Sequence, residues 1–115
     1  MLKFLKSFVF AFQGIKSAFK SEFNFRFHFI AAILTIAAGF YFNITGFEWL
    51  VIILCIGLVI TAELFNTAIE KIVNLVSPEY HPLAGQIKDI AAGAVLIIAI
   101  TSLISGLIIF FPRIF

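Results

Sequence analysis

Two long stretches without any charged residue constrain this chain more than any other feature of its sequence. One runs from Phe29 to Phe47 and the other from Ile90 to Pro112. Each is long enough to cross a hydrocarbon core of roughly 30 Å as an α-helix. With 63% hydrophobic and only 12% charged residues, the chain also departs far from the composition of soluble domains. The sequence therefore predicts an integral membrane protein.

A third apolar stretch, which starts near Trp49, ends in polar residues instead of a loop. It reads VIILCIGLVIT and continues directly into AELFNTAIEKI, residues 62–72. It can span only if these polar residues face protein or a water-filled cavity at membrane depth. Turn-forming residues at 41–49 and 76–86 separate the three apolar stretches. We therefore expect three transmembrane helices, at 24–42, 47–75 and 88–111.

The amino-terminal segment, residues 1–22, is amphipathic and differs from the spans. Apart from Phe10, one helical stripe of it is polar and basic, and most of the phenylalanines fall elsewhere around the helix. The stripe consists of Lys3, Lys6, Gln13, Ser17 and Lys20. This pattern predicts a helix that lies on the membrane surface, where anionic headgroups attract the lysines. The expected fold is one all-α domain over 1–115, with a surface helix and three spans.

Basic residues are distributed unevenly between the two ends of the predicted spans. Arg113 is the one basic residue at the end that carries the carboxyl terminus. The positive-inside rule therefore places the amino terminus and the 77–89 loop in the cytoplasm and the carboxyl terminus outside. The residues on the cytoplasmic side are Lys3, Lys6, Lys16, Lys20, Arg26, Lys71 and Lys88.

Four polar residues of the third stretch share one helical face. Steps of three, four and seven place Glu63, Asn66, Thr67 and Glu70 within about 60° of one another, along roughly 10 Å of helix. A carboxylate near mid-bilayer costs on the order of 2.5–3.5 kcal/mol on insertion scales. The two carboxylates should therefore be paired, protonated or bound to a cation. Lys71 points away from this face, and we expect it to extend toward the headgroups.

Two further polar clusters are expected at the same cytoplasmic boundary. The segment SEFNFRFHF, residues 21–29, contributes Glu22 and Arg26, whereas its His28 is interpreted as an interfacial residue or one with a satisfied hydrogen bond, and not as a ligand. Lys88 and Asp89 open the last span, where Asp89 suits a helix amino terminus and Lys88 is a candidate for binding an anion. Carboxylates with oxygen partners suit Mg²⁺, which binds one or two carboxylates together with substrate phosphates. This chemistry indicates phosphoryl transfer from a nucleotide, although neither a P-loop nor a kinase glycine-rich loop is present.

The stretch AELFNTAIEKIVNLVSPEYHPLAGQIKDIAAGAVL, residues 62–96, resembles the prokaryotic diacylglycerol kinase and undecaprenol kinase family of small membrane proteins. Its motif E-x-x-N-T-A-I-E, followed by S-P-E-Y-H and K-D, is highly specific, and the resemblance extends over nearly the whole chain. It implies a lipid kinase that uses ATP and Mg²⁺ in the bacterial cytoplasmic membrane. It also implies a homotrimer whose active sites are shared between neighbouring subunits.

The resemblance implies a role for each candidate site residue. Glu63 is then the catalytic base on the lipid hydroxyl, and Asn66 supports the substrate. Glu22 and Glu70 are the pair that holds Mg²⁺ on the nucleotide phosphates. The remaining nucleotide contacts come from Glu79, Tyr80, His81, Lys88 and Asp89.

Some alternatives stay open at the level of sequence. EFNFRFH and SPEYHPLA look more like the undecaprenol branch than the diacylglycerol branch, so we expect undecaprenol as substrate with diacylglycerol as the alternative. The same carboxylates would also suit a small cation or proton pathway. A third possibility is an assembly subunit without catalytic activity, in which the carboxylates would tolerate replacement.

Overall fold

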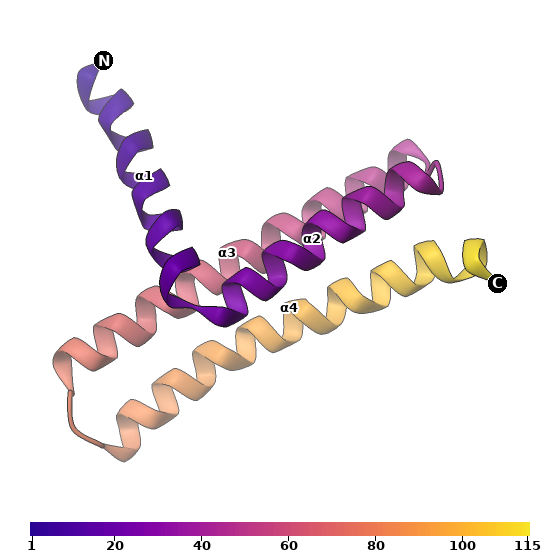
Figure 1. Ribbon diagram of the computed structural model, residues 1–115. Helices are drawn as coiled ribbons and strands as arrows, with labels where there is room; N and C mark the ends of the chain where they lie inside the picture. The colour runs from indigo at the N-terminus through magenta and orange to yellow at the C-terminus, as the bar shows by residue number, and fades with distance from the viewer.

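The computed structural model describes residues 1–115 and consists entirely of helices joined by short turns (Figure 1). The predicted all-α fold is thus confirmed, and three of the four helices are long and apolar enough to cross a membrane. The candidate spans are α2, α3 and α4, and the helix bounds are α1 Leu2–Ser21, α2 Phe23–Tyr41, α3 Gly46–Val76 and α4 Pro82–Ile114.

The three candidate spans form an open layer in which α3 is central. Helix α3 packs along α4 and, less extensively, against α2, whereas α2 and α4 do not approach each other. Helix α1 leaves this layer at a steep angle and touches it only through its carboxyl-terminal end (Figure 1). The packing leaves most large apolar side chains exposed, as expected for helices that face lipid or other protein chains.

The turn between α2 and α3 is built from the residues that its sequence indicates. Asn43 has a left-handed backbone with φ of 50°, a conformation that asparagine tolerates better than most residues. Thr45 caps α3 through a capping box with Glu48. Gly39 is buried beside the turn, and a Cβ there would lie 2.6 Å from the ring of Trp49, so only glycine leaves room for that ring. These contacts hold α2 and α3 close together at this end.

An ion pair joins the ends of α3 and α4 next to that turn. Arg113 Nη1 donates to Glu48 Oε2 at 2.9 Å, and Arg113 Nη2 donates to Glu48 Oε1 at 2.6 Å. Glu48 Oε1 also accepts from the backbone nitrogen of Thr45 at 2.9 Å. A bidentate pair of this kind fixes geometry better than a single contact does. The ion pair therefore links the carboxyl terminus of α4 to the start of α3.

Replacing Arg113 with Gln should lower the thermal denaturation temperature of the purified protein by a few degrees. The substitution removes the two hydrogen bonds to Glu48 and leaves a partly buried carboxylate with fewer partners. A matched Glu48→Gln variant should show a similar decrease in denaturation temperature. The double variant should show little further decrease, because both substitutions remove the same interaction. Additive decreases would contradict the assignment.

Helix lengths set the depth of each residue in the bilayer. Helix α2 has 19 residues, which matches the roughly 30 Å hydrocarbon core, whereas α3 has 31 and α4 has 33. Because the α2–α3 turn is short, the extra length of α3 and α4 extends beyond α2 at the opposite end (Figure 1). About 20 residues of α3 suffice to cross the core. Counted from Gly46, a span of that length ends just past Glu63, and Glu70 lies about 10 Å further along the helix than Glu63.

Helix α4 begins at Pro82 and not at the predicted residue 88. Proline is favoured in the first turn of a helix, and His81 Nδ1 caps the start by accepting from the backbone nitrogen of Leu83 at 3.1 Å. Lys88 and Asp89 consequently lie in the second turn. The explanation of Asp89 by the helix dipole was wrong, because that effect is confined to the first turn.

Candidate active site

Glu63 is the most deeply buried charged side chain of the molecule. Only 3% of its surface is exposed, although it lies on a helix that is largely exposed elsewhere. Its carboxylate oxygen Oε1 contacts His28 Nε2 of α2 at 3.2 Å. The pair joins the first turns of α2 to the middle of α3. A buried carboxylate with a histidine partner is a feature that a membrane protein retains for function more often than for stability.

Two further carboxylates act on Glu63. The charges of Glu22 and Glu70 both repel it, so the three side chains lie near one another. Glu22 stands in extended backbone between α1 and α2, and Glu70 lies two turns beyond Glu63 on α3. Both are partly buried. Three of the predicted site carboxylates, from two parts of the chain, are therefore close enough for their charges to act on one another.

The rest of the polar face on α3 contains unused hydrogen-bonding groups. Asn66 Nδ2 donates to Glu70 Oε1 at 3.3 Å, which confirms that these residues share a face. Asn66 Oδ1 and the hydroxyl of Thr67 are buried without any partner. Unpaired buried polar atoms are rare in folded proteins and indicate a missing ligand or water. These two atoms lie between Glu63 and Glu70, where a substrate or ion would satisfy them.

The neighbouring cationic side chains have other partners. Arg26 Nη1 donates to the carbonyl oxygens of Phe19 and Lys20 at 2.8 and 3.0 Å, and so caps the end of α1. Lys71 is exposed, and its Nζ donates to Ser17 Oγ at 3.3 Å, which links α3 to the end of α1.

Lys88 of α4 also has a protein partner. Its Nζ donates to Asn74 Oδ1 at 2.6 Å. The contact links α4 to the last turn of α3. Lys88 is only partly buried, and an incoming phosphate can replace the neutral amide because a charged acceptor binds the ammonium more strongly.

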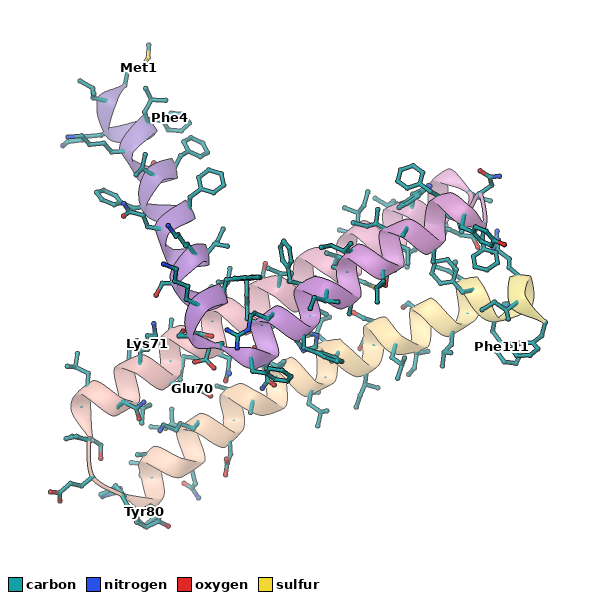
Figure 2. The ribbon with its side chains drawn as sticks, in the orientation of Figure 1. Met1, Phe4, Glu70, Lys71, Tyr80 and Phe111 are labelled. Carbon is teal, nitrogen blue, oxygen red and sulfur yellow. The ribbon has the colours of Figure 1, made fainter.

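The remaining nucleotide candidates lie apart from the carboxylates. Tyr80 is 91% exposed and lies at the tip of the α3–α4 connection, well away from Glu70 (Figure 2). Glu79, His81 and Asp89 are exposed as well. Within one chain, the structure brings together Glu22, Glu63, Asn66 and Glu70. It leaves the 79–81 segment separate.

The donor set suits a hard divalent cation. Carboxylate and amide oxygens are the ligands that Mg²⁺ prefers, and Mg²⁺ completes its octahedron with water and substrate phosphates. No group of three or more His, Cys, Asp or Glu side chains is arranged to hold a metal ion by itself. Glu22 and Glu70, with the free oxygen of Asn66, fit an ion that phosphates also bind. They do not form a closed structural site.

An apolar groove of about 590 Å³ starts at His28 and runs between α2 and α4 over the surface of α3. It exists because α2 and α4 do not meet. Small residues on α2 and α4 leave the space open, and they include Ala31, Ala32, Ala99, Ser102 and Gly106. The groove runs along the helices, and its far end, at Phe110, lies toward the opposite end of the bundle.

The sequence did not predict the role of His28 as the partner of Glu63. A usable signal was present, since an ionisable residue inside a span requires a partner. His28 was a polar residue at the start of the first predicted span. What the sequence lacked was the rotation of α2 about its axis, which decides whether position 28 faces α3 or lipid.

Comparison with known proteins gives a consistent result. The sequence model of the family described as prokaryotic diacylglycerol kinase matches residues 9–110. An undecaprenol kinase of Bacillus subtilis is 46% identical over 96% of this chain and 90% of its own length. A diacylglycerol kinase of Haemophilus influenzae is 35% identical over 93% of this chain and 92% of its own length. A diacylglycerol kinase of Escherichia coli is 29% identical over 93% of this chain and 88% of its own length.

Proposed function

This chain belongs to the prokaryotic diacylglycerol kinase family and is a lipid kinase of the membrane, and from that premise we propose that it transfers the γ-phosphate of ATP to undecaprenol. The observation that carries the proposal is Glu63, a buried carboxylate paired with His28 near the edge of the hydrocarbon core. A lipid hydroxyl lies at this depth, and a nucleotide reaches it from the adjoining aqueous phase. The 46% identity to an undecaprenol kinase supports the choice of lipid.

Glu63 acts as the general base in this proposal. The lipid hydroxyl oxygen attacks the γ-phosphorus, its proton passes to the Glu63 carboxylate, and the bond from the γ-phosphorus to the leaving oxygen of ADP breaks. The products are the lipid phosphate and ADP. Asn66 orients the substrate through its free Oδ1 or its amide group. Positioning and charge neutralisation account for most of the catalysis in such transfers.

Glu22 and Glu70 would hold Mg²⁺, which when bound neutralises charge on the nucleotide phosphates. Lys88 would leave Asn74 to contact a phosphate, and Asp89 lies one residue further along α4. Glu79, Tyr80 and His81 would contact the nucleotide from the α3–α4 connection.

The groove between α2 and α4 supports a lipid with a long apolar tail. A lipid whose hydroxyl lies at Glu63 must extend its tail toward the bilayer centre, and the groove runs in that direction from His28. Its volume of about 590 Å³ lies within the usual range for ligand sites. Only the first part of a polyprenyl chain would fit, and the rest would lie among the acyl chains of the bilayer.

We also propose a homotrimer in the bacterial cytoplasmic membrane, with the amino terminus and the 77–89 loop in the cytoplasm and the carboxyl terminus outside. The open helix layer, with its exposed apolar side chains, is compatible with packing against further copies. A neighbouring subunit could also bring its 79–81 segment to the carboxylates that the same segment does not reach within one chain. The distribution of basic residues supports the orientation.

Assays of the purified protein with undecaprenol and with diacylglycerol, side by side in the same nanodiscs, test the substrate proposal. We expect kcat/KM for undecaprenol to exceed that for diacylglycerol by at least about tenfold, a difference of roughly 1.4 kcal/mol in transition-state binding. Diacylglycerol is the alternative, because two of the relatives above carry that name. A clear preference for diacylglycerol would replace the proposed substrate.

A further inference from the structure

His28 is a partly buried ionisable group to which the proposed mechanism gives no part. Its side chain is 19% exposed, and its Nε2 is 3.2 Å from Glu63 Oε1. It also lines the start of the groove between α2 and α4. It therefore stands between the place where the lipid tail would lie and the carboxylate that would accept the proton.

A partner is needed at this position for an electrostatic reason. A base must be ionised to accept a proton, yet burial and two nearby like charges disfavour an ionised carboxylate. Glu22 and Glu70 are the like charges that act on Glu63. Arg26, Lys71 and Lys88 have other partners. Among the ionisable groups close to Glu63, His28 is the one in direct contact with it, and a protonated imidazole there would carry the opposite charge.

We propose that His28 is a positioning residue for Glu63, which keeps the carboxylate ionised and fixes its orientation. The inference rests on the proposed role of Glu63 as the base. Because His28 contacts Oε1, the other oxygen, Oε2, remains for the lipid hydroxyl. The hydroxyl proton ends on Glu63, and the proton of His28 stays on the imidazole. His28 contacts neither nucleotide nor metal, so its effect is on the proton-transfer step.

Two substitutions separate the charge of His28 from its hydrogen bond. His28→Phe keeps an aromatic ring and removes both, whereas His28→Gln keeps a donor without charge. At neutral pH, we expect His28→Phe to lower kcat by about 10- to 100-fold, part of the 10²–10⁴-fold that a general base contributes. The KM for ATP should change little. His28→Gln should retain more activity than His28→Phe.

The pH dependence of kcat distinguishes positioning from a purely structural contact. In His28→Phe, activity should recover as the pH rises, because hydroxide in the medium then removes the proton that Glu63 retains without its partner. A structural contact would lower the denaturation temperature and leave the shape of the pH profile unchanged. Wild-type kcat in His28→Phe, or an unchanged profile, would overturn the proposal.

Infrared spectroscopy tests the inference without any turnover. Glu63→Gln identifies the carboxyl C=O band of Glu63, and His28→Phe should increase that band at neutral pH relative to the wild type. If the wild type fails to phosphorylate any lipid alcohol, the proposed function fails, but this readout still reports on the pair. If lipids are phosphorylated and the band does not change, only the role of His28 is wrong.

Discussion

Replacing Glu63 with Gln should lower kcat for lipid phosphorylation by about 10²–10⁴-fold, the usual contribution of a general base. Glutamine has nearly the same shape and can still accept a hydrogen bond from His28, but it cannot take up the hydroxyl proton. The KM for ATP should change little, since Glu63 does not hold the nucleotide. Transfer of radiolabelled γ-phosphate to lipid in nanodiscs measures both constants.

Glu48→Gln is the matched control for this experiment. It makes the same chemical change on the same helix, at the end where Glu48 pairs with Arg113. It should lower stability and leave kcat of the folded protein near the wild-type value. Full activity in Glu63→Gln would remove the base from the mechanism. Equal losses in both variants would indicate a general effect on folding.

The spans were predictable because their signal is local. The charge-free stretch that starts at Phe29 covers most of α2, which ends at Tyr41, and a backbone within the bilayer must satisfy its hydrogen bonds by forming a helix. The α2–α3 turn was equally predictable, because Asn43 and Thr45 determine the backbone conformation only within a few residues of their own positions. The early start of α4 also had a local cause in His81 and Pro82. Pro82, the second proline of the 76–86 segment, was predicted from the sequence to lie in a loop, but Pro82 begins α4.

The polar stripe on α3 was predictable from helical spacing, and the contact between Asn66 and Glu70 follows from their separation of four residues. Contacts between helices were not predictable in the same way. Whether His28 meets Glu63, or Lys88 meets Asn74, depends on how each helix is rotated and shifted against its neighbour. Packing along the whole helix determines that geometry, and no short sequence motif predicts it.

Replacing Glu70 with Gln should raise the Mg²⁺ concentration required for activity by at least about tenfold. Loss of a residue that only supports a metal ligand typically costs 10- to 100-fold in metal affinity, so loss of a ligand should cost no less. Removing this charge also relieves repulsion on Glu63, so the base should remain functional. Activity should therefore recover at high Mg²⁺, which separates this variant from Glu63→Gln.

A binding measurement makes the Glu70 prediction independent of turnover. With a non-hydrolysable ATP analogue, Mg²⁺ should raise the denaturation temperature of the wild type, because a ligand that binds only the folded state stabilises it. The Mg²⁺ dependence of that increase should move to higher concentration in Glu70→Gln and in Glu22→Gln, but not in Glu48→Gln. The double variant at 22 and 70 should lose the Mg²⁺ effect. An unchanged Mg²⁺ dependence in both single variants would mean that the ion is held elsewhere, and Glu22 and Glu70 would then serve only to set the charge around Glu63.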